Sequence, residues 1–184
     1  MPEATVIETE RLLLRPPTRE DTQAIFERYA SDADVTRYLG WPKHTSVQDT
    51  QAFVGFSLSE WARWGVGPLL AFDRESGTLL GGSGLVMETA DRAATGYVFA
   101  RDAWGKGYAT ESLRATIALA AERNIARLYA LCHVDHQASC RVLEKCGFQR
   151  EGVILRHLVF PNLSSEPLDV FRYARSPYDR PTTS

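Results

Sequence analysis

A strand, a glycine-rich turn and a helix follow one another between residues 97 and 121, and this unit constrains the fold more than any other part of the chain. Tyr97-Val-Phe99 combines aromatic and β-branched residues, as strands do. Gly105 and Gly107 then allow a tight turn and a close approach of the backbone to a ligand. A helix is predicted from about Thr110, because apolar residues recur at helical spacing after it.

The start of this predicted helix offers a site for an anion. The first N–H groups of a helix have no partner within the helix, and the helix dipole favours negative charge there. We therefore predict that backbone amides of residues 104–110 bind a phosphate group. Two common phosphate loops are excluded: Thr110 stands where the dinucleotide fingerprint has its third glycine, and no G-x-x-x-x-G-K-[ST] occurs.

Composition indicates one globular domain. The 184 residues are 44% hydrophobic and 24% charged, and we expect a single domain over residues 1–175 with a loose tail over 176–184. The net charge of −2 offers no electrostatic footprint for nucleic acid. We find no apolar run long enough to cross a bilayer and no signal-peptide pattern, so we expect no nucleic-acid or membrane partner and a cytoplasmic location.

The three cysteines, Cys132, Cys140 and Cys146, have no C-x-x-C spacing. Their odd number and spacing favour reduced thiols packed in a core over a disulfide framework or a zinc site. No metal site is predicted. A nucleophilic thiol is the less favoured alternative, because a buried cysteine usually behaves as a small apolar residue.

Hydrophobic periodicity and turn residues divide the rest of the chain into strands and helices, which together indicate a mixed α/β sheet with helices on both faces. Strands are predicted at residues 8–15, 69–72, 78–87, 94–100, 127–133, 148–158 and 168–174, with a polar loop at 88–94. Helices are predicted at 18–29, 31–39, 46–64, 110–122 and 135–146.

Helix boundaries carry their own signals. Thr18-Arg-Glu-Asp21 and Ser46-Val-Gln-Asp49 each have the spacing of a capping box. Asp135 is the predicted N-cap of the last helix, and Gly147 is its predicted left-handed stop. Gly81, Gly82 and Gly84 interrupt a predicted strand and indicate a bulge or a close backbone approach.

Several segments, in order, resemble the GNAT family of N-acetyltransferases. Trp104-Gly-Lys-Gly-Tyr-Ala109 resembles the family's [Gln/Arg]-x-x-Gly-x-[Gly/Ala] loop, with tryptophan at the Gln/Arg position. The segment from His133 to Phe148 resembles the family's Asn-x-x-Ser…Leu-Glu-Lys-x-Gly-Phe motif. The opening at residues 9–15 is similar to the Rim-type branch, which acetylates protein N-termini. With the ending at 151–174, the resemblance covers about residues 8–174.

This resemblance implies the GNAT fold, a strongly twisted mixed sheet of about seven strands with helices on both faces. Two central parallel strands, here 94–100 and 127–134, would splay apart. The pantetheine arm of acetyl-CoA would lie in the splay along the strand edge at Val98, Phe99 and Ala100, and the diphosphate would lie on the loop amides. The remaining cofactor-binding residues implied are Trp104, Gly105, Lys106, Gly107, Tyr108, Ala109, Thr110, His136 (where the family has asparagine) and Ser139, with a weaker expectation for Arg101.

The expected activity is transfer of an acetyl group from acetyl-CoA to a primary amine by direct attack in a ternary complex. Ala94 stands where many relatives have a glutamate, and Leu143 where many have a tyrosine. We predict that Ser139 donates a hydrogen bond to the CoA sulfur and that Glu88 is the catalytic base. Asp91 or a water chain through His133 are alternatives for the base.

The acceptor is left open by the sequence. Ribosomal N-termini, small amines and antibiotics all fit, and the chain could be a monomer or a homodimer. Tyr38, Trp41, Trp61, His157 and Phe160 are predicted for the acceptor wall, although core packing is the simpler interpretation of the tryptophans. A non-catalytic acyl-CoA-binding module, or an enzyme acting on another nucleotide phosphate, are the alternative functions.

Overall fold

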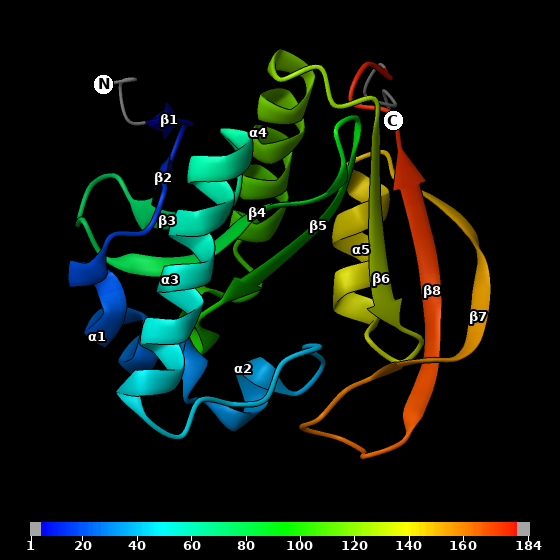
Figure 1. Ribbon diagram of the computed structural model, residues 1–184, viewed down its shortest axis with the longest axis horizontal. Coiled ribbons are helices and arrows are strands. Elements are labelled where there is room, and N and C mark those ends of the chain that lie inside the picture. Colours follow the sequence, from blue (N-terminus) through cyan, green and yellow to red (C-terminus); the bar gives the residue numbers. More distant parts are fainter. Residues whose placement is uncertain (1–4, 180–184) are drawn as a thin grey trace.

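A computed structural model describes residues 5–179 and shows one eight-stranded mixed sheet in the order β1-β2-β3-β4-β5-β6-β8-β7 (Figure 1). Only β5 and β6 are parallel neighbours, and the other pairs are antiparallel. The strands are β1 (Ile7–Glu8), β2 (Leu12–Arg15), β3 (Pro68–Asp73), β4 (Leu79–Thr89), β5 (Arg92–Phe99), β6 (Arg127–His133), β7 (Gln149–Val159) and β8 (Pro167–Arg175). The eighth strand, beyond the seven expected, is the two-residue β1, which pairs with β2.

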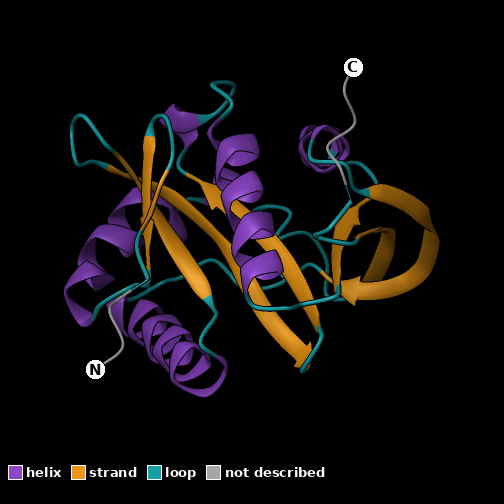
Figure 2. Ribbon diagram, turned by 90° about the horizontal axis from the view of Figure 1, so that it is seen from above, coloured by secondary structure: helices purple, strands orange, loops and turns teal. Residues whose placement is uncertain are grey.

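Helices cover both faces of the sheet, as predicted (Figure 2). α3 packs on β3 and β4, whereas α4 packs on β4 and β5 from the opposite face. The helices are α1 (Thr22–Ile25), α2 (Ala33–Thr36), α3 (Val47–Trp64), α4 (Tyr108–Glu122) and α5 (Gln137–Lys145). A 3₁₀ turn at Arg19–Asp21 precedes α1 and a π turn at Phe26–Ala30 follows it, so the predicted helix 18–29 is one irregular helical segment.

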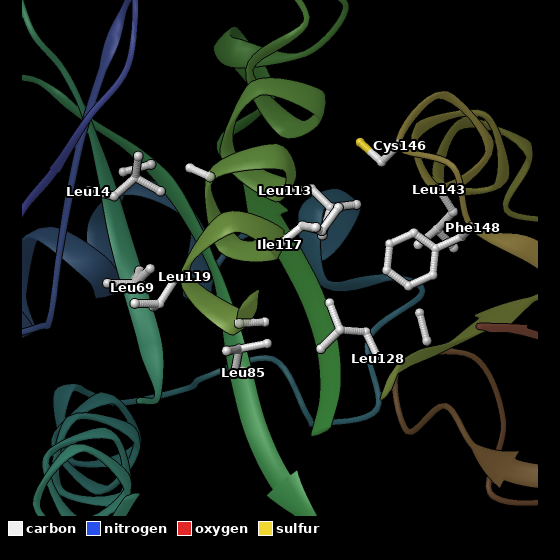
Figure 3. Close-up of a cluster of buried hydrophobic side chains, with 14 of the residues drawn as sticks. Leu14, Leu69, Leu85, Leu113, Ile117, Leu119, Leu128, Leu143, Cys146 and Phe148 are labelled. Atoms are coloured by element: carbon white, nitrogen blue, oxygen red, sulfur yellow. The ribbon is translucent and has the colours of Figure 1, made fainter. Parts of the chain in front are cut away.

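Alternate residues of the strands build two cores. On β3, Leu69 and Ala71 belong to the cluster under α4, whereas Leu70 belongs to the cluster under α1 and α3. Leu113 and Ile117 of α4 fill the space between the two halves of the sheet (Figure 3). Burying a leucine of this kind stabilises the fold by roughly 1.5–3 kcal/mol, so α4 holds both halves together.

The predicted helix signals are mostly confirmed. Both capping boxes are present, and Gly147 has the left-handed φ of 80°. The prediction for Asp135 is wrong: the N-cap of α5 is His136, and the Asp135 N–H instead donates to Nδ1 of His133 at 3.1 Å. That hydrogen bond turns the chain one residue further before the helix begins.

The polar loop predicted at 88–94 is also wrong. β4 continues to Thr89, which pairs with Arg92 at the start of β5, so only two residues turn the hairpin. The polar residues that suggested a loop are on the exposed part of a long strand pair. Close backbone approach at the strand glycines is confirmed, since a Cβ on Gly82 would lie 2.3 Å from the Leu69 carbonyl oxygen.

The predicted tail begins as a turn. The Asp179 N–H donates to the Ser176 carbonyl at 3.2 Å, and the Arg175 guanidinium donates to the Asp179 carbonyl at 2.7 Å. Residues 180–184, the rest of that prediction, lie outside the described residues.

The parallel strands β5 and β6 separate, as the family resemblance implied. They pair only through Arg92–Arg127, Ala93–Leu128 and Ala94–Tyr129, and then diverge toward their C-terminal ends (Figure 1). Residues 96–99 of β5 therefore have no strand partner on the β6 side. This splay, with the glycine turn that follows β5, positions the candidate site.

Candidate active site

The turn between β5 and α4 presents a row of free backbone donors. Gly105 and Gly107 adopt left-handed φ values of 71° and 82°, which glycine reaches without a steric penalty. Within residues 5–179, the amides of residues 105–110 make no hydrogen bond to another protein group, whereas the Trp104 amide donates to Arg101 at 3.2 Å. The predicted cradle thus begins at Gly105, one residue later than expected.

A partly buried ion pair between Arg11 and Glu111 supports this turn. The Glu111 carboxylate in the first turn of α4 accepts hydrogen bonds from the Thr9 hydroxyl at 2.6 Å and from the Arg11 amide and Nε at 2.8 and 2.7 Å. Arg11 also donates to the Lys106 carbonyl at 2.8 Å. Burial alone would raise the pKa of Glu111, but these hydrogen bonds outweigh it and lower the pKa below its ordinary value. The turn is therefore fixed before any ligand binds.

The free edge of β5 is narrower than predicted. The Ala100 N–H donates to Leu80 of β4 at 2.7 Å, and Val98 pairs with Gly82 of β4. Because backbone groups alternate along a strand, it is Phe99 and Tyr97 that face the splay. The indole Nε1 of Trp104 already donates to the Phe99 carbonyl at 2.8 Å. Of the three predicted edge residues, Phe99 alone presents a free N–H to a ligand arm.

Ser139 lies at the splay with a partner that the sequence did not reveal. The Tyr97 hydroxyl of β5 lies 2.8 Å from Ser139 Oγ and donates to the Ser139 carbonyl at 2.9 Å. Burial raises the pKa of Tyr97, so its phenol stays protonated. Leu143 is buried in the core, so the phenol in this site comes from the strand and not from α5. Spacing gives no signal for a contact between residues 42 positions apart.

His136 belongs to an aromatic cluster at the ends of β6 and α2. Its ring stacks on Tyr38 with centroids 4.6 Å apart, and the same tyrosine lies 5.1 Å from His133. Phe160 packs edge-on against His133 at 4.9 Å. Burial and the neighbouring His133 lower the pKa of His136 to about 4, so its imidazole is neutral near pH 7. A neutral ring can still donate one hydrogen bond.

The predicted bases lie apart from one another. Glu88 is exposed near the hairpin end of β4 and pairs with Arg92 at 2.8 Å. Asp91 is exposed in the hairpin itself, where its side chain accepts from the Thr89 hydroxyl at 2.8 Å. His133 is buried, and its Nδ1 is occupied by the Asp135 N–H.

A cavity of about 630 Å³ lies between α3 and strands β3, β4 and β5. Residues 94–98 of β5 form one side, so the cavity reaches the strand that borders the splay. Of the five predicted wall residues, Trp41 alone lines it. The other four lie elsewhere: Trp61 donates Nε1–H to the Pro68 carbonyl, His157 is exposed, and Tyr38 and Phe160 belong to the histidine cluster.

His44 is the cavity residue that the sequence reading missed. Its Nδ1 lies 2.8 Å from the Thr50 hydroxyl, and its ring packs on Trp41 with centroids 4.9 Å apart. Burial lowers the pKa of His44 and outweighs the attraction of Asp49. Position alone gave no signal for this role, because His44 stands in the loop before α3, far along the chain from the motifs.

Charged and nucleophilic side chains near the splay are mostly engaged. Arg101 pairs with Asp32 and Asp34 at 2.7 and 2.9 Å, whereas Lys106 makes no ion pair within the described residues. The three cysteines are free and buried, as predicted, and burial raises the pKa of Cys132 to about 12. A thiol in that state is a poor nucleophile. Residues 5–179 contain no cluster of three metal-ligating side chains and no helix that could span a membrane.

Comparison with known proteins identifies the family. A family model described as "Acetyltransferase (GNAT) domain" matches residues 11–149. The N-acetyltransferase YoaA of Bacillus subtilis is 30% identical over 161 residues, covering 83% of this chain and 88% of the relative. YkkB of the same organism is 32% identical over 154 residues, covering 82% of this chain and 88% of the relative. The chain therefore belongs to the GNAT family of acetyltransferases.

Solved structures agree with this assignment. A GNAT acetyltransferase from Bacillus anthracis superposes with a TM-score of 0.82 and 28% identity, covering 95% of this chain and all of that one. RimL, a ribosomal L7/L12 α-N-protein acetyltransferase solved with coenzyme A, superposes with a TM-score of 0.84 and 25% identity. The match covers 94% of this chain and 98% of the RimL chain. The chain is thus an acetyltransferase of the GNAT fold with acetyl-CoA as its acyl donor.

Proposed function

We propose that this enzyme acetylates a primary amine carried by an apolar group, such as the N-terminus of a peptide with an apolar first segment. The observation that carries the proposal is the arrangement of the two sites. The free amides at 105–110 follow directly on the strand whose residues 94–98 border the cavity. A diphosphate held on those amides would place the pantetheine arm in the splay and the thioester beside the cavity.

The cavity lining supports an apolar acceptor. Its aromatic side chains include Tyr29, Trp41, Phe53 and Phe56, and most of the remaining lining is aliphatic or glycine. Asp49 is the single carboxylate among the described residues that line the cavity, and its Oδ2 already accepts from the Thr45 and Ser46 amides just before α3. A polyamine needs several carboxylates, because each buried ammonium group must be paired. The cavity therefore favours a monoamine over spermine.

His44 is the group in the cavity best suited to take the amine proton. The attacking nitrogen must lose a proton as the C–N bond forms, and a positioned base contributes about 10²–10⁴-fold. His44 is neutral at pH 7 because burial lowers its pKa. Glu88 stays a prediction, although its pairing with Arg92 outside the cavity lining does not favour it.

Two features favour catalysis over a non-catalytic binding module. The Tyr97–Ser139 pair provides a hydroxyl at the splay, and His44 provides a base in the cavity. Together they stand in for the glutamate and tyrosine that are missing at Ala94 and Leu143. The cytoplasmic location and the oligomeric state stay predictions.

Release of CoA thiol from acetyl-CoA tests the proposal. We expect turnover with peptides that have a free N-terminus and an apolar first residue, and at least tenfold lower kcat/KM with spermine or with the same peptides blocked at the N-terminus. No turnover with any amine in the panel would contradict the proposal, and a preference for spermine would contradict the acceptor class.

The base is tested by paired variants. We expect His44→Gln to lower kcat/KM about 100-fold and to leave acetyl-CoA binding unchanged, whereas Glu88→Gln changes it less than threefold. In the wild type the acidic limb of kcat/KM should fall below pH 6.5, because the pKa of His44 is lowered. The reverse order of the two variants would identify Glu88 as the base.

A further inference from the structure

The Tyr97–Ser139 contact crosses the splay between β5 and β6. Tyr97 belongs to β5, and Ser139 belongs to the first turn of α5, which follows β6. The two residues are 42 positions apart, yet their hydroxyl oxygens lie 2.8 Å from each other. Three residue pairs join β5 to β6, and all of them precede Tyr97. This contact therefore spans the open part of the splay, where the acyl donor of the proposed function would lie.

Ser139 needs a partner if its hydroxyl is to point into the splay. A serine in a helix usually turns its hydroxyl back to its own backbone. Ser139 is the sole hydroxyl residue in α5, and its oxygen instead meets the Tyr97 phenol. The phenol also donates to the Ser139 carbonyl at 2.9 Å, which fixes the backbone of the same residue. Tyr97 thus restrains Ser139 at two atoms.

The surroundings of Tyr97 keep it a donor. Tyr97 packs against the core cluster that contains Cys132, Cys140 and Cys146, and burial raises the pKa of its phenol. The phenol therefore stays protonated near neutral pH, and burial also raises the pKa of the Cys132 and Cys146 thiols. A negative charge that appears on a nearby sulfur would therefore find hydroxyl donors and no competing anion.

We propose that Tyr97 is a positioning residue that aims the Ser139 hydroxyl at the sulfur of coenzyme A. The inference rests on the proposed function, since it requires acetyl-CoA in the splay. The amine nitrogen forms the new C–N bond, the C–S bond breaks, and its electron pair stays on the sulfur as a thiolate. The Ser139 O–H donates a hydrogen bond to that thiolate while the Tyr97 O–H rotates to donate to Ser139 Oγ. The amine proton goes to the base, and Tyr97 loses no proton.

Binding of coenzyme A tests this assignment without an acceptor. A free thiol ionises at about pH 8.5, so binding of the CoA thiolate can be compared with binding of desulfo-CoA, which lacks the sulfur, at pH 7 and pH 9. The readout is the Kd ratio, the Kd for desulfo-CoA divided by the Kd for CoA. In the wild type we expect this ratio to rise about fivefold to tenfold from pH 7 to pH 9. Tyr97→Phe and Ser139→Ala should each abolish that increase, with the Kd for desulfo-CoA unchanged within twofold.

Double substitution and a matched tyrosine sharpen the test. Because Tyr97 acts through Ser139, the double variant should be no worse than Ser139→Ala alone. Tyr97→Phe should lower kcat about tenfold with the KM for acetyl-CoA unchanged. Tyr129→Phe, a control on β6 whose phenol makes no hydrogen bond within the described residues, should retain both the Kd ratio and kcat.

The outcomes separate a failure of the Tyr97 assignment from a failure of the proposed function. A wild-type Kd ratio that does not rise with pH, or Tyr97→Phe with an unchanged ratio, would overturn the assignment while leaving the proposed function intact. Additive effects in the double variant, or equal weakening of CoA and desulfo-CoA by Tyr97→Phe, would show a purely structural tyrosine. If the wild type bound neither ligand, the proposed function would fail as well.

Discussion

At the scale of single residues, His136 connects pH to stability. Its ring stacks on Tyr38, and burial lowers its pKa from 6.5 to about 4. The unfolded chain therefore binds a proton between these two values and the folded chain does not. The stabilisation is fully present above pH 6.5 and is lost as the pH falls toward 4.

We therefore predict that His136→Asn flattens this pH dependence. Asparagine does not titrate, so relative to pH 8 the wild type should lose about 1–2 kcal/mol more unfolding free energy at pH 5 than the variant does. Urea denaturation of both proteins at the two pH values measures the difference. Parallel losses in both proteins would assign the pH dependence to another group that titrates in this range, such as His44, whose pKa burial also lowers.

Gly96 tests the acceptor cavity at the same scale. It lines the cavity, and a Cβ placed on it meets no atom within 4 Å. Gly96→Leu should fill the cavity and raise the acceptor KM at least tenfold, with the Kd for CoA unchanged. Gly55→Leu on α3, where a Cβ also meets nothing, is the control and should change neither value. An unaltered acceptor KM in Gly96→Leu would place the acceptor elsewhere.

Sequence reasoning succeeded for residues whose role is local and failed for those brought together by the fold. The amides at 105–110 follow from two glycines and a helix start, and they are free as expected. Tyr97 was missed because it meets Ser139 across the splay. His44 was missed because its role comes from the cavity, whose other walls are distant strands, and not from its local contacts with Thr50 and Trp41. A period-two pattern says that Tyr97 and Phe99 share an orientation along β5, but it does not say what lies opposite them.

At the scale of elements, the Arg11–Glu111 pair joins the residue just before β2 to the start of α4. Glu111 accepts the Arg11 Nε at 2.7 Å, and the same guanidinium donates to the Lys106 carbonyl in the turn. A charged group in this position restrains the turn that presents the free amides. The pair also places the negatively charged Glu111 carboxylate near the proposed phosphate site, and the positive charge of Arg11 offsets it.

We predict that Arg11→Ala weakens CoA binding about tenfold by calorimetry, because the turn loses its restraint and Glu111 loses its countercharge. Glu111→Gln should have a smaller effect, since it removes one negative charge near the diphosphate as well as the ion pair. Arg123→Ala, at the far end of the same helix, is the control and should bind CoA normally. Equal affinity in Arg11→Ala and the wild type would show that the turn holds its shape without the pair.

Element boundaries were predictable where caps or glycines mark them. Both capping boxes and the Gly147 stop appear as expected, and β6 has the predicted bounds at 127–133. The β4–β5 hairpin was missed because its exposed residues are polar on a strand that extends beyond the core. Polarity along one face of a long strand resembles a loop when only the sequence is read.

At the scale of the whole molecule, the sheet consists of two parts with a weak seam. β1–β5 and β6–β8 share three residue pairs, and α4 packs against side chains from both parts (Figure 3). The splay itself was predicted from the family resemblance and not from hydrophobic periodicity, since no local pattern fixes the angle between two strands. A ligand arm lying in the splay would add contacts that the seam lacks.

CoA should therefore protect both parts of the sheet and the turn at once. The amides at 105–110 have no hydrogen-bond partner among the described residues, so they should exchange hydrogen rapidly in the free protein and slowly with CoA bound. At one hundred times its Kd, CoA should raise the free energy of unfolding by about 2.7 kcal/mol, which raises Tm by roughly 5–10 °C for a domain of this size.

Hydrogen exchange by mass spectrometry, with ADP as a control that lacks the pantetheine arm, separates the turn from the splay. ADP should slow exchange in the turn alone, whereas CoA should also slow residues 96–99 of β5 and the C-terminal end of β6. If CoA and ADP gave the same pattern, the arm would lie outside the splay, and the seam would be stabilised by α4 and the Tyr97–Ser139 contact alone.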